Sequence, residues 1–266
     1  MQELTELRRL YLDMVQRCII NTIYEDPNQG FWSPQVFDGQ LRDLGRDWPS
    51  RAHSMIGNLR MSNLRDIIEF VIASNIAGDF IETGVWRGGA CIMARAVFKA
   101  YQVTDRRVWV ADSFCGLPRP NPKYSADAGD QHHLYAELAI SLNEVKSNFA
   151  KYDLLDDQVV FLQGWFSETL PKAPIERLAV LRLDGDMYES TMDGLQNLYD
   201  KVSSGGFVIV DDFGAVPACQ QAIMEFRSRR RIEDPIQNID GIGVFWRKSA
   251  VADRGLSATP VGAHAD

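Results

Sequence analysis

Two short apolar runs that end in aspartates constrain the fold of this chain more than any other feature. The first reads Leu-Ala-Val-Leu-Arg-Leu-Asp-Gly-Asp over residues 178–186, and the second reads Gly-Gly-Phe-Val-Ile-Val-Asp-Asp-Phe over residues 205–213. Such runs, separated by a helical interval, are typical of neighbouring parallel strands in an α/β sheet. Ligands of these sheets bind beyond the carboxyl ends of the strands. We therefore expect four acids to crowd one place there: Asp184, Asp186, Asp211 and Asp212.

Four carboxylates at one place raise one another's pKa unless a cation or shared protons neutralise them. Oxygen ligands without nitrogen or sulfur suit a hard cation such as Mg²⁺. The alternative interpretation is that these acids cap helices or lie in solvated loops. The sequence favours a shared metal site at the mouth of the sheet.

Composition and charge exclude several classes of function. The chain has 266 residues, 45% of them hydrophobic and 24% charged, as in a globular protein with one α/β domain. Its formal net charge of -8 argues against a nucleic-acid partner, because phosphate backbones select basic surfaces. No apolar run reaches about 18 residues and no signal peptide is present, so we expect a cytoplasmic protein. The cysteines are too far apart for a zinc site or a disulfide framework: Cys18, Cys91, Cys115 and Cys219.

The N-terminal part of the chain precedes the expected sheet. Apolar residues at the spacing i, i+3, i+4, i+7 predict an amphipathic helix over residues 4–23, which would pack on the core or on a partner subunit. Residues 26–49 are rich in Pro, Gly, Asn and Asp and include large aromatics that we expect to be exposed. This stretch is either a surface loop or, as the aromatics favour, a lid over a ligand: Phe31, Trp32, Phe37 and Trp48.

A glycine-rich turn follows the first expected strand. Gly84, Gly88 and Gly89 form a tight turn that leads into a helix. The spacing differs from the dinucleotide pattern G-x-G-x-x-G, and Glu82 lies where a pyrophosphate would approach. A ligand with its own positive charge and an amino-acid moiety suits this turn better. The next strand ends in Asp112, an acid that either accepts hydrogen bonds from ribose hydroxyls or caps the segment after it.

Seven strands are expected, and five of them alternate with helices. Helices are predicted over residues 62–76, with Ser62 or Asn63 as the N-cap, and over 90–101, 138–152 and 217–230. The last two strands are joined at Asp240-Gly241, a hairpin signal. The strands centre near Phe80, Val108, Val159, Val180, Val208, Ile236 and Val244.

This order predicts an α/β fold: a Rossmann-like, doubly wound sheet of seven strands with a C-terminal antiparallel hairpin and an N-terminal helical and lid extension. We expect residues 1–248 to form a single domain, in which residues 1–60 hold the N-terminal helix and the lid segment. Residues 249–266 show no periodicity and are expected to form a disordered tail.

Several motifs within this pattern match a known family. They extend roughly from Tyr11 to Arg247: Ala52-His-Ser-Met-Ile-Gly57, Ile81-Glu-Thr-Gly-Val-Trp-Arg-Gly-Gly89, Trp109-Val-Ala-Asp-Ser-Phe114, Leu181-Arg-Leu-Asp-Gly-Asp-Met-Tyr-Glu-Ser-Thr191 and Asp211-Asp-Phe213. With them the chain resembles the class I S-adenosylmethionine-dependent methyltransferases. More narrowly, it resembles the macrocin O-methyltransferase family, whose members methylate sugar hydroxyls of antibiotics such as macrolides and aminocoumarins. Two departures are Cys115, where the family more often has Glu, and residues 120–133, which leave the acceptor open.

The resemblance implies a set of ligand-binding residues. Glu82, Gly84 and Trp86 would line the amino-acid and sulfonium end of S-adenosylmethionine, and Asp112 would bind its ribose. Mg²⁺ would be held by Asp184, Asp211 and Asp212. The full set implied for the cofactor is Ser54, Met55, Glu82, Thr83, Gly84, Val85, Trp86, Asp112, Ser113, Ser141, Gly164 and Trp165.

The chemistry of the reaction suits these residue types. A sugar hydroxyl is a poor nucleophile at neutral pH, because it holds its proton tightly. A divalent ion would polarise that oxygen, and Asp184 or Asp186 would take the proton as the catalytic base. His132 and His133 are alternative bases. Because the acids are expected to lie at an exposed site, Asp211→Ala should abolish transfer and leave the fold intact.

The sequence therefore predicts a Mg²⁺-dependent O-methyltransferase that acts on a sugar hydroxyl of a macrolide- or aminocoumarin-type natural product. A second interpretation keeps the fold and the metal but replaces the acceptor by a catechol or another small hydroxyl. A third is a cofactor-binding scaffold without turnover, against which the intact acids argue. We expect a small glycosylated substrate, no nucleic-acid or membrane partner, and a homodimer or higher homo-oligomer.

Overall fold

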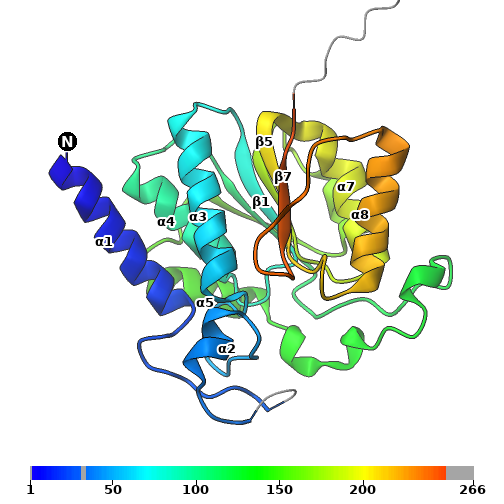
Figure 1. The fold of residues 1–266 in the computed structure, drawn as a ribbon, viewed down its shortest axis with the longest axis horizontal. Coiled ribbons are helices and arrows are strands. Elements are labelled where there is room, and N and C mark those ends of the chain that lie inside the picture. Colours follow the sequence, from blue (N-terminus) through cyan, green and yellow to red (C-terminus); the bar gives the residue numbers. More distant parts are fainter. Residues whose placement is uncertain (1, 31–33, 250–266) are drawn as a thin grey trace, which may run out of the picture.

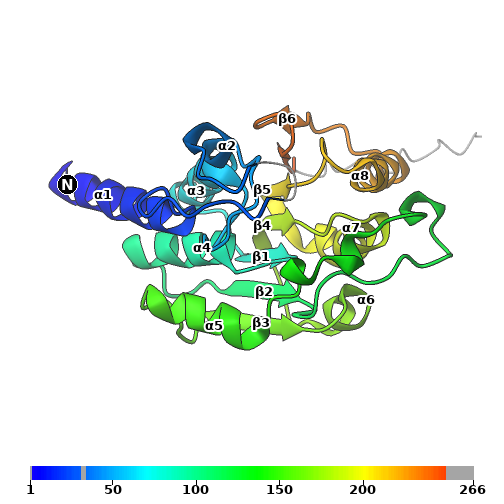
Figure 2. The same cartoon turned by 90° about the horizontal axis from the view of Figure 1, so that it is seen from below.

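The fold is that of a computed structural model, which describes residues 2–30 and 34–249. In this part of the chain, seven strands form one sheet in the order β3-β2-β1-β4-β5-β7-β6. The first five strands pair in parallel, and β7 pairs antiparallel with both β5 and β6. Helices cover both faces of the sheet (Figure 1, Figure 2). The predicted doubly wound α/β fold with a C-terminal antiparallel hairpin is confirmed.

Apart from β6, which is a polar pair, the strands are short and mainly apolar. They are β1 (Asp79–Thr83), β2 (Val108–Asp112), β3 (Val159–Gln163), β4 (Leu178–Leu183), β5 (Val202–Val210), β6 (Gln237–Asn238) and β7 (Val244–Arg247). The α-helices are α1 (Gln2–Ile19), α2 (Gly39–Asp43), α3 (Gly57–Ala73), α4 (Gly89–Ala100), α5 (Leu142–Lys151), α6 (Phe166–Thr169), α7 (Tyr188–Leu198) and α8 (Pro217–Arg230). Short 3-10 helices occupy Ser125–Asp127, His132–Leu134, Ala136–Leu138, Leu170–Lys172 and Tyr199–Lys201.

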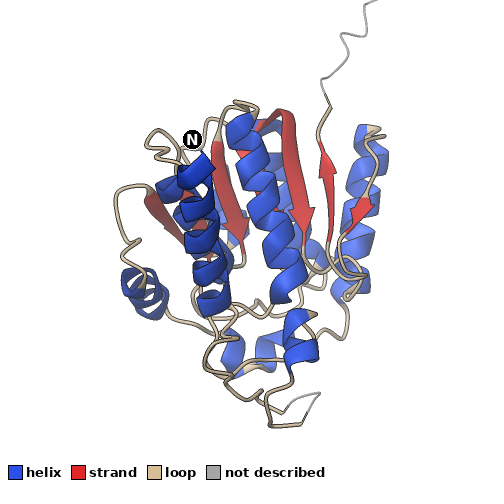
Figure 3. Cartoon of the chain, turned by 60° about the vertical axis from the view of Figure 1, so that its left-hand side comes forward, coloured by secondary structure: helices blue, strands red, loops and turns tan. Residues whose placement is uncertain are grey.

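The sheet has an apolar core on each face, because successive side chains of a strand point to opposite sides. Phe80 and Val180 lie in a core cluster with residues of α1, α3, α4 and α5. Ile81 and Leu181 lie in a second cluster with residues of α7 and α8. Figure 3 shows the strands between these helical layers. Since both faces are covered, the carboxyl ends of the strands form the edge at which polar side chains can meet a ligand.

The start of α3 differs from the prediction. The helix begins at Gly57, and Ser62 and Asn63 lie inside it, so neither is its N-cap. Arg60 and Met61, in the first turn, are buried. Long-range packing of these two residues extends the helix where no side-chain cap is present.

The start of α5 also differs, and here a local signal explains it. The helix begins at Leu142, because the hydroxyl of Ser141 accepts a hydrogen bond from the amide of Glu144 at 3.2 Å. Ser and Glu at this spacing are typical of a helix N-terminus. The preceding residues form the 3-10 helix Ala136–Leu138 instead of the first turn of the helix.

The outer face of α1 remains apolar in the isolated chain. Its inner face is buried through Leu12, Val15 and Ile19, whereas the outer face exposes half or more of the side chains of Leu7 and Met14. The expected self-association through this helix stays a prediction. None of the described helices is long and apolar enough to cross a membrane. The predicted tail lies outside the described residues from position 250 onward.

Residues 26–49 are held by a buried ion-pair network that the sequence did not reveal. Arg42, in α2, is fully buried and donates to Asp47 at 2.8 Å and to Asp26 at 2.9 Å. Its other donors bind the carbonyl groups of Ile20 and Asp26, both at 2.9 Å. A buried guanidinium is stable only when its donors are paired. The network therefore fixes this segment to the chain that follows α1.

The two aromatic residues of this segment that the structure describes, Phe37 and Trp48, are not the exposed side chains that the lid interpretation assumed. Trp48 is only 2% exposed, and Phe37 is half-buried with the guanidinium of Arg42 5.3 Å from its ring centroid. Phe31 and Trp32 lie outside the described residues. Trp48 nevertheless lines the large cavity at the strand ends, so the segment borders the candidate site.

We predict that Arg42→Ala lowers the free energy of unfolding by about 3–5 kcal/mol, because it leaves two buried carboxylates without their counter-charge. Urea denaturation followed by circular dichroism measures the change. Arg51→Ala is the control, since the Arg51 side chain is exposed, and its effect should stay within about 0.5 kcal/mol. Equal stability of the two variants would show that the network does not hold the segment.

Candidate active site at the carboxyl ends of the strands

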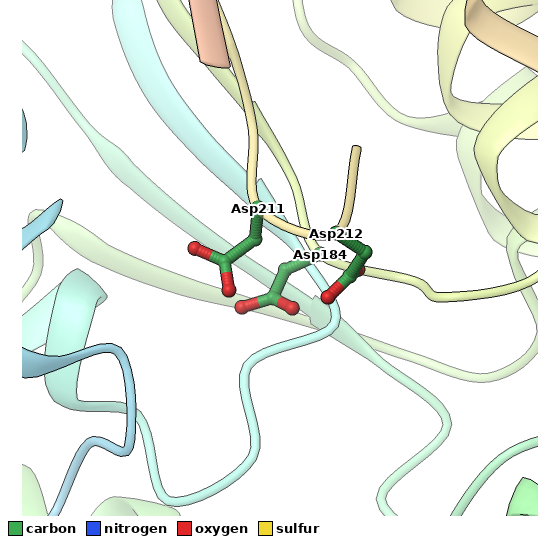
Figure 4. A group of neighbouring side chains, drawn as sticks. All are labelled: Asp184, Asp211 and Asp212. Carbon is green, nitrogen blue, oxygen red and sulfur yellow. The ribbon is translucent and has the colours of Figure 1, made fainter. Parts of the chain in front are cut away.

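The ends of β4 and β5 bring the predicted acids together. Leu183 pairs with Val210, so the residues that follow these two strands lie side by side. One carboxylate oxygen from each of Asp184, Asp211 and Asp212 lies within 4.8 Å of the other two (Figure 4). The fourth acid, Asp186, belongs to the same group, since its amide donates to Oδ2 of Asp212 at 3.1 Å.

Two buried arginines neutralise part of this group. Arg182, inside β4, bonds Asp184 at 2.5 Å and also binds Asp211 and Glu82, the latter from β1. Arg60, from α3, binds the second oxygen of Asp211. The sequence analysis missed both arginines. A lone Arg within the apolar run of β4 was the available signal for Arg182.

The position of Asp211 corrects an expectation about exposure. Its side chain is 5% exposed, and both of its carboxylate oxygens bind guanidinium groups. Removing it would leave Arg60 and Arg182 without a shared partner in a buried site. Asp211→Ala is therefore expected to destabilise the fold, so it does not test the chemistry by itself.

Burial and mutual repulsion raise the pKa values of the acids nearest the cavity. Burial first, and then the neighbouring charge of Asp211, raises the pKa of Asp184 well above its usual range. Burial and the charges of Asp186 and Asp184 do the same for Asp212. The pKa of Asp186 rises to about 6, mainly through burial. Two guanidinium groups face four aspartates and Glu82 here, so the arginines can compensate only part of the charge of this group.

The remaining donor atoms fit a hard divalent cation. Arginine binds Oδ2 of Asp184 and both oxygens of Asp211, and the amide of Asp186 binds Oδ2 of Asp212. Among the contacts of the described residues, Oδ1 of Asp184 and Oδ1 of Asp212 remain for a ligand. Carboxylate oxygens with excess negative charge are the donors that Mg²⁺ prefers. Asp184 and Asp212, with Asp211 beside them, could therefore hold such an ion.

The glycine-rich turn after β1 lies directly against these acids. Gly84 has a φ of 86°, and a Cβ added there would lie 1.7 Å from the carbonyl oxygen of Asp184. Only glycine allows this approach. The carboxylate of Asp112 holds the turn by accepting the amides of Val85 at 2.8 Å and of Phe114 at 2.7 Å. Asp112 thus fixes the backbone locally and also lines the cavity.

A cavity of about 970 Å³ joins the acids and this turn. Thr83 and Ser141 are not among its lining residues: Thr83 is buried in β1, and Ser141 caps α5. His132 lines the cavity, whereas His133 does not. The other residues that the sequence assigned to the cofactor all line it, namely Ser54, Met55, Glu82, Gly84, Val85, Trp86, Asp112, Ser113, Gly164 and Trp165.

The segment between the lid region and α3 forms another part of the wall. The carbonyl of His53 accepts the amide of Gly89 at 2.9 Å, so this segment lies on the first turn of α4. The ring of His53 bonds the Tyr152 hydroxyl through Nδ1 at 2.7 Å. Burial, helped by the positive charges of Lys151 and Arg87, lowers the pKa of His53 to about 4. His53 is therefore neutral near pH 7.

Comparison with known proteins gives one consistent result. The sequence profile of a family described as macrocin-O-methyltransferase (TylF) matches residues 12–248. The 8-demethyl-8-(2,3-dimethoxy-alpha-L-rhamnosyl)-tetracenomycin-C 4'-O-methyltransferase of Streptomyces olivaceus is 50% identical over 259 residues, which are 96% of this chain and 99% of that protein. The demethyldecarbamoylnovobiocin O-methyltransferase of Streptomyces niveus is 50% identical over 247 residues, 90% of this chain and 94% of that protein.

Two further comparisons agree with these. The mycinamicin III 3''-O-methyltransferase of Micromonospora griseorubida is 49% identical over 247 residues, 91% of this chain and 97% of that protein. The solved structure of the O-methyltransferase NovP is 49% identical in sequence. It superposes with a TM-score of 0.88 over 91% of this chain and 100% of that chain.

We predict that the contribution of the neutral His53 ring to stability is lost between pH 6.5 and pH 4. Its pKa is lower in the folded state than in the unfolded state, so the neutral ring stabilises the fold above about pH 6.5, and this contribution is lost as the pH falls through about 4. A shift of this size contributes at most about 3 kcal/mol. In His53→Gln the unfolding free energy, measured by urea denaturation, should decline less over this range. If the unfolding free energy changed with pH in the same way in the wild type and in His53→Gln, the assignment of this effect to His53 would be wrong.

Proposed function

The chain belongs to the macrocin O-methyltransferase family and is an O-methyltransferase, and from that premise we propose that it transfers a methyl group from S-adenosylmethionine to a sugar hydroxyl of a glycosylated antibiotic. The observation that carries this proposal is the meeting of the glycine-rich turn and the acidic strand ends in one cavity. The first supplies a place for a donor with a positive charge. The second supplies bases and possible metal ligands for a hydroxyl acceptor.

The donor would lie against the turn after β1. Glu82 binds Arg182 through Oε1 and the thiol of Cys91 through Oε2 at 2.9 Å. Each carboxylate oxygen keeps a second lone pair, so Glu82 can also accept from an ammonium group in the cavity. Asp112, at the end of β2, lines the same cavity and would accept from ribose hydroxyls.

We propose Asp186 as the base. Asp184 is bonded to Arg182, whereas the pKa of Asp186 is about 6, which suits a proton acceptor near neutral pH. Asp186 also has a φ of 55°, and such backbone strain in a residue other than glycine is common at functional sites. Its carboxylate would take the hydroxyl proton while the acceptor oxygen bonds to the methyl carbon. The bond from that carbon to sulfur would break in the same step, its electron pair would stay on sulfur, and S-adenosylhomocysteine would leave.

Mg²⁺, held by Asp184 and Asp212 with Asp211 beside them, would act as a Lewis acid that lowers the pKa of the acceptor hydroxyl. The donor set described above supports this part of the proposal. Arg182 and Arg60 would keep Asp184 and Asp211 in place. The acidic edge then has two tasks: it binds the cation through some oxygens and accepts the proton through Asp186.

The acceptor class follows from the relatives. Their names specify a rhamnosyl tetracenomycin, a novobiocin precursor and mycinamicin III as the molecules on which they act. We propose a sugar of a macrolide-, aminocoumarin- or tetracenomycin-type compound as the acceptor of this chain. A cavity of about 970 Å³ is in the range of ligand sites that enclose drug-sized molecules.

We predict that the purified protein, with S-adenosylmethionine and Mg²⁺, adds one methyl group to at least one member of a panel of glycosylated macrolides, aminocoumarins and tetracenomycins. Mass spectrometry of the products measures this. The controls are the matching aglycones and a simple catechol, which should remain unchanged. Methylation of the catechol or of an aglycone, but of no glycoside, would overturn the sugar assignment.

We predict that Asp212→Asn lowers kcat/KM by at least about 100-fold, since it removes a negatively charged ligand from the cation site. The unfolding temperature should stay close to that of the wild type, because Asp212 binds no arginine among the described residues. EDTA should inactivate the wild type, and added Mg²⁺ should restore it. Asp157→Asn, on the exposed turn before β3, is the control. Full activity of the EDTA-treated enzyme would remove the metal from the mechanism.

A further inference from the structure

A second wall of the cavity comes from residues between 113 and 138, and this segment is firmly anchored. Asp127 is 1% exposed, and its two carboxylate oxygens accept the amides of Tyr188 at 2.7 Å and of Glu189 at 3.0 Å. These are the first amides of α7, which lack partners within the helix. Asn121 adds a bond to the Glu189 side chain at 3.0 Å. The segment is therefore fixed to the helix that starts beside the catalytic acids.

Three residues after this anchor, Asp130 orients a histidine. Its carboxylate accepts the backbone amide of His132 at 2.9 Å and contacts Nδ1 of the same ring at 2.6 Å. A carboxylate at Nδ1 keeps a proton on that nitrogen. Nε2 of His132 is then the ring atom left for a ligand. The His132 side chain is 34% exposed and lines the cavity.

An aromatic pair continues this wall. The ring of Tyr135 lies 6.2 Å from that of His132, and Trp48 contacts Tyr135 edge-on at 5.7 Å. Both residues line the cavity, and Tyr135 is 38% exposed whereas Trp48 is only 2% exposed, so Tyr135 can meet a ligand while its contact with Trp48 supports it. Trp48 belongs to the segment held by Arg42, so both sides of this contact are fixed.

We propose that His132 and Tyr135 form the subsite for the sugar ring of the acceptor, a role that rests on the proposed function. Nε2 of His132 hydrogen-bonds a ring hydroxyl other than the one that is methylated. Tyr135 packs against the C–H face of the ring. Asp130 positions the histidine and does not touch the substrate.

The chemistry of the two cavity walls supports a sugar ring as the ligand of this subsite. A sugar ring carries hydroxyls around its edge and C–H groups on its faces, so it needs polar partners on several sides and an apolar surface. The acidic edge engages one hydroxyl. His132 lies close enough to this edge for the charge of Asp186 to act on its ring. Although burial opposes the shift, the charge of Asp186, and then that of Asp130, raises the pKa of His132. A catechol has only one other hydroxyl, and it is on the neighbouring ring carbon, beside the first.

The experiment distinguishes a substrate contact through Nε2 of His132 from one through Nδ1. Kinetics are measured with the panel glycoside that the wild type converts with the highest kcat/KM. His132→Ala should raise the acceptor KM at least 10-fold, with little change in the KM for S-adenosylmethionine. In His132→Gln the side-chain amide reaches about as far as Nε2, and in His132→Asn only as far as Nδ1. Gln should therefore restore part of the affinity, and Asn should not. His133→Ala, next in the chain but not on the cavity wall, is the matched control.

Tyr135→Leu tests the ring contact and should raise the acceptor KM several-fold. The unfolding temperature and the calorimetric Kd for S-adenosylhomocysteine should stay unchanged in all variants. Unchanged values exclude a general loss of structure. An acceptor KM within twofold of the wild type in His132→Ala would overturn the subsite, and so would equal KM values in the Gln and Asn variants. Failure of the wild type to methylate any glycoside would instead overturn the proposed function.

Discussion

The buried guanidinium of Arg182 is the interaction on which the active-site edge depends. It lies among Glu82, Asp184 and Asp211, which come from three neighbouring strands. Carboxylates removed from water repel one another, and each costs several kcal/mol unless a positive charge compensates it. Arg60 neutralises the other side of Asp211. The charge of the carboxylates that bind Arg182 and Arg60 is thus compensated. The negative charge that remains is concentrated at the cavity.

The same guanidinium connects the two halves of the site. Glu82 lies in the strand that leads into the glycine-rich turn, and Asp184 follows the strand beside it, so Arg182 fixes the distance between the donor side and the acidic side. The close approach of Gly84 to the Asp184 carbonyl fixes the backbone in the same way. Methyl transfer requires the acceptor oxygen, the methyl carbon and the donor sulfur to be in line, with the base beside that oxygen, and positioning of this kind contributes much of the rate.

The sequence predicts the strands and the acids at their ends, but it does not predict the buried ion pairs that hold them. The apolar runs predict the strands, and the parallel order of the strands predicts that Asp184 and Asp212 lie together. Both predictions depend only on local sequence pattern. The partners of Arg182 and Arg42 lie up to 100 residues away, and no periodicity marks such pairs. For this reason Asp211 was expected to be exposed although it is buried. Ser141 shows the opposite case, since a local capping signal was present and placed it on a helix instead of at the cavity.

The two walls of the cavity differ in how their positions are fixed. The acids stand at the ends of buried strands, where any shift would disturb both cores of the sheet. His132 and Tyr135 stand on a loop whose position rests on Asp127 and, through Trp48, on the Arg42 network. Substitutions between these anchors can reshape the acceptor wall without moving the acids. The fold therefore separates the chemistry, which needs a rigid frame, from the choice of acceptor, which needs a surface that can vary.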